Sequence, residues 1–449
     1  MIEKPLALLV VPPVYDFALF DLFIKPYSLL KLGKVLQNSG YRVHLVNALD
    51  YREQKSIERL GRPPRKSNGT GKFFRQIAAK PGILRETVAG NPDRDYFRYG
   101  IIKEVFAERL RAREPDVVLV FSGMTYWYPG VQEAVRIIRN SFPRIPVILG
   151  GIYASLCTEH ALRFSGADFV VSGAALPRLG EILASLSLPL PRGRHNEEML
   201  LYSEISAEAG VIRINRGCPF NCSYCASRAL SGPFRAGSSG NALKAVIKLH
   251  QFLGTRNFAF YDDALLADKE RGIVPFLEGV ISLGLALNFY IPNGVHLRFL
   301  DYKVARLMKL AGFREIRMGF ESSDLAFHRE SGNKLEVPML AAGIEILKSA
   351  GFQSEEINVY ILVGLPGQYR EEVEESIAFA AALGLRVRLA SYSPVPGTAL
   401  WEKSIRLSPL PLTEDPLTHN NTLLPLQWPG LNLDDLRELK GLARASRSV

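Results

Sequence analysis

The chain has 449 residues, of which 47% are hydrophobic and 22% charged, with four cysteines and a formal net charge of +10. This length predicts two domains, and this composition excludes disordered, collagen-like and disulfide-rich secreted proteins. No apolar run approaches the roughly 20 residues that a membrane span requires, and the run near the N-terminus is too short for a signal peptide. We therefore expect a folded cytoplasmic protein without a membrane span.

Residues 6–190 alternate short apolar runs with helical patterns. The apolar runs are "LALLVV", "YRVHLV", "DVVLVF", "PVILGG" and "DFVVSG". Strands that are apolar throughout and separated by amphipathic helices indicate a parallel sheet covered on both faces. The sequence therefore predicts an α/β fold whose first domain, residues 1–200, is a five-stranded doubly wound, Rossmann-like sheet.

One stretch of this domain departs from the pattern. Residues 51–100 hold twelve Lys or Arg against five Asp or Glu, and they are too long and polar for an ordinary crossover. We interpret residues 50–100 as a basic inserted loop. Its charge suits either solvated surface or contact with phosphates, whereas we do not expect a nucleic acid partner.

After a polar link near 190–208, strand and helix patterns alternate six more times. The strand candidates are "VIRINR", "NFAFYD", "LNFYIP", "EIRMGF", "INVYILVG" and "RVRLASYS". Six such units predict a partial (βα)6, TIM-like barrel over residues 208–400. Residues 401–449 are Pro-rich before a final helical pattern, and we expect this C-terminal extension to lie over the barrel.

Three of the four cysteines, Cys218, Cys222 and Cys225, lie in the short segment "RGCPFNCSYC" directly after the first barrel strand. Thiolates at this spacing suit a soft metal centre. Zinc lacks a fourth ligand at a familiar spacing, and a redox cysteine pair does not account for the third thiol. A 4Fe-4S cluster held by three cysteines leaves one iron open.

Polar residues also follow the other barrel strands, at the end where barrel active sites are built. The polar residues are Asp262, Asp263, Asn293, Glu321 and Ser322, and the last two strands run into the turns that carry Gly364 and Pro396. Random surface residues would not fall after every strand at the same end, so one face of the barrel is predicted to be a binding site.

The cysteine spacing, with Tyr224 before the last cysteine, resembles the signature of radical S-adenosylmethionine (radical SAM) enzymes, and so does the six-unit barrel. The resemblance implies that the three cysteines hold a 4Fe-4S cluster whose open iron binds S-adenosylmethionine (SAM). An electron from the cluster would then give a 5′-deoxyadenosyl radical that abstracts hydrogen from a substrate. Such enzymes need an electron donor such as flavodoxin or ferredoxin.

The same resemblance suggests cofactor roles for the strand-end residues. Asp262 and Asp263 correspond to contacts of the methionyl amino group, although "YDDAL" stands where Gly-Gly-Glu is usual, and a helix cap is the alternative. Glu321 and Ser322 correspond to the ribose side, and Asn293 to ribose or methionine. Gly364 in "GLPG" and Pro396 in "PVPGT" correspond to the adenine side and the closing strand, where turns alone are the alternative.

A doubly wound domain ahead of such a barrel resembles the cobalamin-binding subgroup. The implied contacts are Ser122, Gly123, Thr125, Gly150, Gly151 and Gly173. Two departures stand out, because "PPVYDFALFDLF" lacks the usual axial histidine and "SGAALP" lacks the usual acidic pair. A degenerate domain that serves as a substrate platform is the alternative. Cys157 is interpreted as a small buried apolar residue.

We therefore expect a radical SAM enzyme, cobalamin-dependent, that performs methyl transfer or rearrangement at an unactivated carbon of a small or phosphorylated substrate; no catalytic residue is assigned. The alternatives are a radical SAM enzyme without cobalamin and a non-catalytic iron–sulfur sensor. Methylthio transfer to transfer RNA would need a second cluster, for which the first domain has only Cys157.

Overall fold

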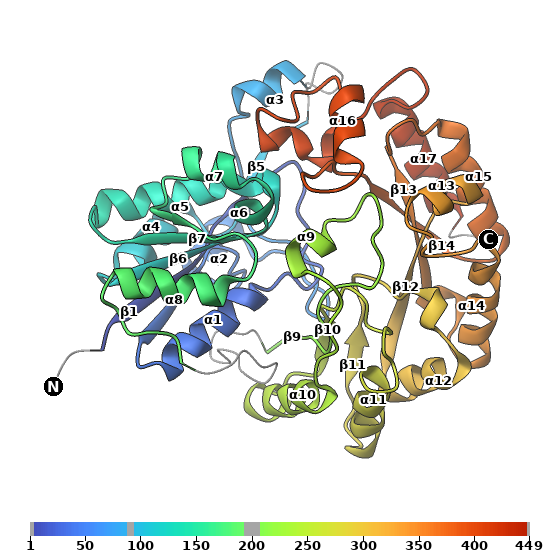
Figure 1. The fold of residues 1–449 in the computed structure, drawn as a ribbon, viewed down its shortest axis with the longest axis horizontal. Coiled ribbons are helices and arrows are strands. Elements are labelled where there is room, and N and C mark those ends of the chain that lie inside the picture. Colours follow the sequence, from blue (N-terminus) through green and yellow to red (C-terminus); the bar gives the residue numbers. More distant parts are fainter. Residues whose placement is uncertain (1–3, 88–93, 193–206, 447–449) are drawn as a thin grey trace. The chain divides into compact units, whose positions relative to one another are not determined.

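The computed structural model describes residues 4–87, 94–192 and 207–446 (Figure 1). The chain divides into two compact units, Met1–Ile205 with Glu414–His419, and Ser206–Thr413 with Asn420–Val449. Most of the polar link expected near 190–208 lies outside the described residues. Within the described residues, no helix is both long and apolar enough to cross a membrane.

The first unit contains the predicted five-stranded parallel sheet. Its strands are β1 (Leu6–Val11), β3 (Arg42–Asn47), β6 (Val117–Ser122), β7 (Val147–Gly151) and β8 (Phe169–Val170), in the spatial order β3-β1-β6-β7-β8. β1 is buried along its whole length, which explains why it is apolar at every position. The order reverses between β1 and β6, and ligands bind at the carboxyl ends of strands beside such a reversal.

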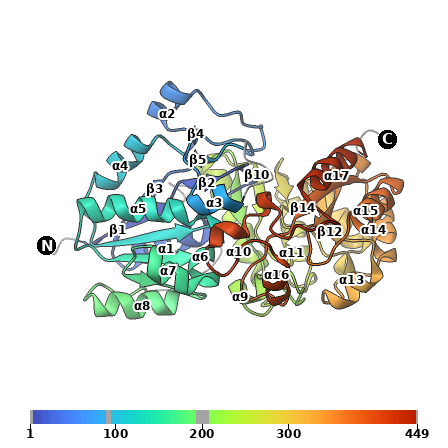
Figure 2. The ribbon, with the colours of Figure 1, turned by 90° about the horizontal axis from the view of Figure 1, so that it is seen from above.

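Helices cover both faces of this sheet, as expected for a doubly wound fold. α1 (Tyr27–Asn38) and α8 (Ala175–Ser185) lie on one side, and α4 (Lys103–Arg111) and α5 (Tyr128–Ser141) lie on the other (Figure 2). Two short helices, α6 (Ile152–Leu156) and α7 (Thr158–Phe164), join β7 to β8. The doubly wound prediction for this unit is confirmed.

The basic insert is not simply a loop, which corrects the expectation for residues 50–100. It contains α2 (Gln54–Leu60) and α3 (Gly82–Thr87), and its strand β5 (Phe97–Tyr99) pairs antiparallel with both β4 (Arg75–Ile77) and β2 (Val14–Asp16). Three-residue strands are too short to show a period of two, and their partner strand is remote in sequence. No local signal could therefore predict this sheet.

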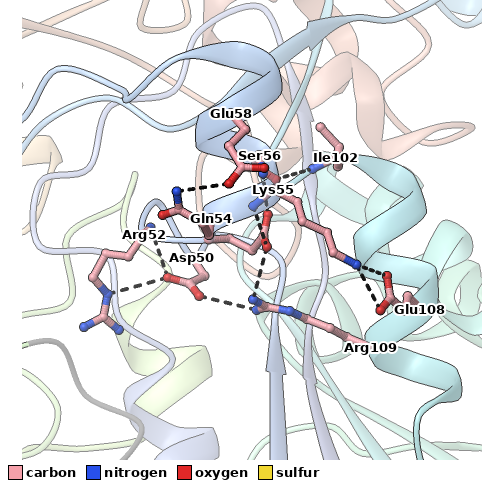
Figure 3. A network of polar contacts seen from close by, with 10 residues as sticks. Asp50, Arg52, Gln54, Lys55, Ser56, Glu58, Ile102, Glu108 and Arg109 are labelled. Atoms are coloured by element: carbon pink, nitrogen blue, oxygen red, sulfur yellow. Dashed lines mark hydrogen bonds and ion pairs between the residues drawn. The ribbon is translucent and has the colours of Figure 1, made fainter.

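Ion pairs anchor the insert to its own unit. Buried Arg98 of β5 contacts Glu133 of α5 with its guanidinium, and Tyr15 Oη donates to the same carboxylate at 2.6 Å. Figure 3 shows a second network, in which Lys55 Nζ lies 2.8 Å from Glu108 Oε2 of α4. Basic residues of the insert thus neutralise carboxylates of the same unit, which reduces the charge left for a partner.

The second unit contains the predicted partial barrel. Six parallel strands have the order β14-β13-β12-β11-β10-β9, so that β9 and β14 are open edges. The strands are β9 (Gly210–Ile212), β10 (Asn257–Phe260), β11 (Asn288–Tyr290), β12 (Phe313–Glu321), β13 (Ile357–Val363) and β14 (Arg386–Ser391). Each of the six predicted runs overlaps one of these strands. The fold class is therefore confirmed for both units.

Helices lie on the outer face of this sheet (Figure 1). They are α10 (Ser239–Leu253), α11 (Ile273–Ser282), α12 (Tyr302–Ala311), α14 (Pro338–Ser349) and α15 (Arg370–Ala382). Fully buried Phe258, Phe260, Phe276, Phe289 and Phe313 fill part of the core between the strands and these helices. Because the core lies outside the sheet, the inner face is left to polar side chains.

Shorter helices complete the second unit. α9 (Ser227–Ser231) follows the cysteine segment, α13 (Leu325–Glu330) follows β12, and α16 (Trp401–Leu407) follows β14. The final helix α17 (Leu433–Ala445) packs against α15 and β14. The C-terminal extension is therefore divided: most of it belongs to the barrel, and Glu414–His419 belongs to the first unit.

Candidate active site

The cysteine segment runs from the carboxyl end of β9 and is held by backbone contacts. The backbone of Arg216 forms an isolated antiparallel β-bridge with that of Arg235, and the backbone of Cys218 forms a parallel β-bridge with that of Pro233. Between them, Gly217 has φ +75°, and a Cβ on it would lie 2.7 Å from the carbonyl oxygens of Gly232 and Pro233. Only glycine fits this turn. The turn places Cys218, the first cysteine, against the connection between β9 and β10.

Asp262 fixes the start of the same segment. Its carboxylate is almost fully buried and accepts hydrogen bonds from the backbone N–H groups of Ile214, at 3.1 Å, and Asn215, at 2.6 Å. The structure thus gives Asp262 a structural role that the sequence did not suggest. Its neighbour Asp263 points elsewhere and accepts from Ser227 Oγ at 3.1 Å, which in turn accepts from Cys225 Sγ at 3.2 Å.

The three cysteines differ in exposure: Cys218 is buried, Cys222 is half-buried and Cys225 is exposed. Burial raises the pKa of the Cys218 thiol to about 11. Burial also raises the pKa of Cys222, and the ammonium of Lys334 opposes that rise.

No group of three or more His, Cys, Asp or Glu within the described ranges is arranged to hold a single metal ion. This is consistent with the three cysteines, because in a 4Fe-4S cube each thiolate binds a different iron. Three thiolates within eight residues are a donor set that fits such a cluster.

Lys334 is a site residue that sequence reasoning missed. It follows α13, and its Nζ lies 2.7 Å from Glu321 Oε1 and 3.1 Å from Tyr224 Oη, inside the cysteine segment. Burial by itself lowers the pKa of Lys334, but Glu321 and Cys222 raise it above its ordinary value. A charged ammonium is therefore held beside the cluster ligands. The segment "SGNKLE" carries no local signal for this role.

His296 is a second residue that the sequence did not reveal. Its Nε2 lies 3.5 Å from Cys218 Sγ, and its ring stacks on Phe220 with centroids 5.1 Å apart. Burial, followed by the positive charge of Lys334, lowers the pKa of His296 to about 3, so the ring is neutral. The sequence "NGVHLRFL" offers only one histidine in a turn, and its contact with Cys218 arises from tertiary packing.

The remaining predicted barrel residues gather at the same strand ends. Asn293 Nδ2 donates to the carbonyl of Asp262 at 3.1 Å, and Glu321 ends β12 with φ +73°. Ser322 is buried, and its Oγ accepts from Asp324 N at 3.0 Å. The structure thus brings these residues to the edge of the sheet that carries the cysteines.

Gly364 directly follows β13, and Pro396 lies in the segment that follows β14, the last strand. Gly364 has φ +87° and donates its N–H to Gln368 Oε1 at 2.8 Å, while Pro396 is half-buried. The cysteine segment reaches the connection that carries Pro396, because Leu400 N donates to Ser223 O at 2.9 Å. These contacts tie the first and last strands of the open barrel to one loop.

In the first unit, Ser122, Gly150 and Gly151 meet at the carboxyl ends of β6 and β7. Ser122 Oγ donates to Gly150 O at 2.8 Å, and a Cβ on Gly151 would lie 2.2 Å from Ser122 O. By contrast, a Cβ on Gly150 or Gly173 would meet no atom within 4 Å. These glycines leave open backbone at the carboxyl ends of β7 and β8, the edge at which doubly wound sheets bind ligands, which fits a bulky ligand such as cobalamin.

The other two residues predicted to contact cobalamin, Gly123 and Thr125, lie against side chains of the same unit. A Cβ on Gly123 would lie 2.7 Å from the Trp127 ring, and Trp127 Nε1 donates to Asp16 Oδ2 at 2.8 Å. Thr125 is buried, with its Oγ1 3.2 Å from His419 Nδ1. Gly123 therefore makes room for Trp127, and Thr125 contacts Glu414–His419.

Cys157 joins α6 to α7 and is half-buried, so it is less buried than the sequence suggested. Burial, followed by the charge of Asp415, raises the pKa of its thiol to about 12. The nearby His160 uses Nδ1 to contact Tyr153 Oη at 2.7 Å. The His160 imidazole thus connects α7 to Tyr153 of α6.

Comparison with known proteins agrees with this geometry. Residues 212–380 match the family model of the radical SAM superfamily, and residues 93–182 match that of the B12 binding domain. The chain is 25% identical over 357 residues to the uncharacterized methyltransferase PH0819 of Pyrococcus horikoshii, a match that covers 72% of the chain and 73% of the relative.

Two further comparisons extend over most of the chain. It is 22% identical to the anaerobic magnesium-protoporphyrin IX monomethyl ester cyclase of Cereibacter sphaeroides, over 67% of the chain and 55% of the cyclase. The radical SAM methyltransferase TsrM of Kitasatospora setae, solved with cobalamin and a [4Fe-4S] cluster, has the same fold, with a TM-score of 0.66 at 15% identity over 90% of the chain and 76% of TsrM. Residues 212–380 therefore form a radical SAM domain and residues 93–182 a B12 binding domain, and the chain is an enzyme whose cofactors are a 4Fe-4S cluster, SAM and cobalamin.

Proposed function

We propose that the chain transfers a methyl group from SAM to an unactivated carbon of a small substrate, in a cobalamin-dependent reaction. The observation that carries this proposal is the three-cysteine segment beside the Lys334–Glu321 ion pair, in a chain that also holds a B12 binding domain. The methyltransferase names of PH0819 and TsrM support it. Bound together, the three cofactors supply a single electron and a transferable methyl group.

The barrel residues have distinct parts in this proposal. Cys218, Cys222 and Cys225 would each bind one iron. Asp262 would hold their segment in place by accepting hydrogen bonds from two of its backbone N–H groups. The residues that would contact SAM are Asp263, Asn293, Glu321, Ser322, Gly364 and Pro396. The ion pair of Lys334 with Glu321 would keep that carboxylate oriented in a partly dry site.

In the first unit, Ser122, Gly150, Gly151 and Gly173 would contact cobalamin at the carboxyl ends of the strands, with Gly123 and Thr125 beneath the covering Trp127 and His419. The β1–α1 connection contains no histidine, so the lower face of the corrin would carry no imidazole from that position. We further propose an external donor such as flavodoxin or ferredoxin and a cytoplasmic location, because clustered free thiols need a reducing compartment.

Metal content tests the cofactor assignment. We expect about four irons and one cobalt per chain after reconstitution without oxygen in the presence of cobalamin. Replacing Cys218, Cys222 or Cys225 with Ala should remove the iron and leave the cobalt, because the cobalamin contacts lie in the other unit. The fourth cysteine provides the matched control: Cys157→Ala should keep both metals. Zinc in place of iron would contradict the assignment.

Labelled SAM tests the reaction itself. The loaded enzyme is incubated with a low-potential reductant, S-[methyl-²H₃]adenosylmethionine and a small-molecule extract of the source organism. We expect a product whose mass rises by that of one deuterated methyl group, and Cys222→Ala should abolish it. Cleavage of SAM without label in any extract component would contradict methyl transfer and favour another radical reaction.

A further inference from the structure

The inner face of the barrel sheet carries a charged network. On β12, Ile316, Met318 and Phe320 are fully buried toward the helices, so the alternate residues Glu315 and Arg317 point to the inner face. The same alternation places Asn358 and Tyr360 of β13, and Arg386 and Arg388 of β14, on that face. Charged side chains of β12 and β14 therefore meet the polar side chains of β13 on the inner face of the barrel.

The contacts within this network are specific. Arg317 Nη1 donates to Tyr360 Oη at 2.7 Å, and its Nη2 donates to Glu315 Oε2 at 3.1 Å. Arg388 Nη2 donates to the other oxygen of the same carboxylate at 2.9 Å, and its Nε donates to Asn358 Oδ1 at 2.7 Å. Two guanidinium groups thus share a single carboxylate, which leaves one positive charge uncompensated within the network.

The network lies close to the proposed cofactor residues. Tyr360 Oη donates to the carbonyl of Pro292, the residue before Asn293, at 3.3 Å. Arg317 and Gly319 point to the same face of β12, and a Cβ on Gly319 would lie 2.5 Å from Glu321 Oε1. A small molecule lying on the inner face could therefore contact the arginines with one end and approach the cofactor residues with the other.

Exposure separates the two arginines. The Arg317 side chain is 9% exposed and the Arg388 side chain 37% exposed, so only the second can readily donate to a ligand. An uncompensated guanidinium that is partly removed from water favours a bound anion, and its planar fork matches a carboxylate or phosphate. An ion-pair network with a purely structural role would not need the extra positive charge.

We propose that Arg388, which shares the Glu315 carboxylate with Arg317, binds an anionic group of the substrate, either a carboxylate or a phosphate. This inference rests on the proposed methyl transfer, since it names the substrate class of the same site. Arg388 acts as a specificity residue: it holds the end of the substrate that does not react, and the carbon that receives the methyl group lies toward the strand ends.

Chemical masking of the substrate tests the class. The small-molecule extract is divided and treated with alkaline phosphatase, or esterified with acidic methanol, before enzyme and labelled SAM are added. Loss of the labelled product after phosphatase identifies a phosphate, and loss after esterification, with recovery on saponification, identifies a carboxylate. A labelled product undiminished by both treatments would overturn the anionic class while methyl transfer stands. No labelled product from untreated extract would overturn the proposed function and this inference with it.

Variants then test the residue with the acceptor so identified. We expect Arg388→Gln to raise KM for the acceptor about tenfold or more with kcat little changed, because a remote binding contact is lost. Glu315→Gln should not raise KM, because it removes the competing carboxylate. Arg437→Gln, which removes the same charge from exposed α17, is the matched control and should leave both constants unchanged. Equal increases in KM for Arg388→Gln and Glu315→Gln would show a structural network and overturn the proposal.

Discussion

The Nε2 atom of His296 lies 3.5 Å from the Sγ atom of Cys218, although the two residues are 78 positions apart in the sequence. The ring is neutral, and its stacking on Phe220 fixes its orientation. With its proton on Nε2, the imidazole donates a hydrogen bond to the thiolate. Hydrogen bonds to ligand sulfurs are one of the means by which a protein sets the potential of an iron–sulfur cluster.

We therefore predict that His296→Phe lowers the reduction potential of the loaded cluster. A donor stabilises the more negatively charged reduced state, so removing a bond of roughly 1 kcal/mol should shift the potential by about −40 mV. Phenylalanine preserves the stacking. A redox titration followed by electron paramagnetic resonance measures the shift, with His250→Phe on α10 as the control. Equal potentials for His296→Phe and the unmodified enzyme would show that no such bond forms.

The Lys334–Glu321 ion pair should be strongly coupled. Its side chains are 13% and 11% exposed, so replacing Lys334 alone with Met leaves a buried carboxylate without its partner. We expect a loss of about 3 kcal/mol in the free energy of unfolding. The double variant K334M/E321Q should recover part of this loss. Chemical denaturation of the reduced, cluster-free chain measures it, and purely additive losses would contradict the coupling.

Glu53 should make the stability of α2 depend on pH. Its carboxylate accepts hydrogen bonds from Lys55 N and Ser56 N at the start of the helix. Burial opposes ionisation, but these bonds and Arg109 lower the pKa of Glu53 below its ordinary value of 4.5. The stabilisation that ionised Glu53 gives is therefore fully present at pH values above the pKa of Glu53 in the unfolded chain. It is lost as the pH falls through the lower pKa of Glu53 in the folded chain.

We predict that Glu53→Gln destabilises α2 by about 1 kcal/mol at pH 7. The difference from the unmodified chain should diminish as the pH falls below 4.5 and through the lowered pKa of folded Glu53. Amide hydrogen exchange of residues 54–60, corrected for the intrinsic effect of pH, measures it. The matched control is Glu58→Gln, which removes the same charge from the same helix, whereas the cap at the helix start is made by Glu53. A difference that persists at low pH would contradict the assigned role.

Tyr128 should hold part of the C-terminal extension on the first unit. Its Oη lies 3.0 Å from both carboxylate oxygens of Asp415, and Leu417 N donates to the same carboxylate at 2.8 Å. Tyr128→Phe removes one charge-assisted hydrogen bond, worth about 2 kcal/mol. We expect faster amide exchange over residues 414–419 and no change in α17. Unchanged exchange in both segments would show that packing alone holds this segment.

Local patterns in the sequence determined much of this protein. The apolar runs and the helical spacing between them predict both parallel sheets, because a strand covered on both faces must be apolar along its length. The three cysteines lie within eight residues, so their shared role requires no knowledge of the fold. Polar residues after successive strands indicate the edge of the sheet where the site lies, because the carboxyl ends of parallel strands meet there.

Tertiary structure alone decided which groups surround the cluster ligands. Lys334 reaches Tyr224 across 110 residues, and His296 reaches Cys218 across 78, from segments without a recognisable pattern. The same holds for Asp262, whose carboxylate turned out to hold backbone N–H groups. A buried charge or imidazole is stable only beside a specific partner, and long-range packing selects that partner. No local pattern records this choice, so these residues emerge only once the chain is folded.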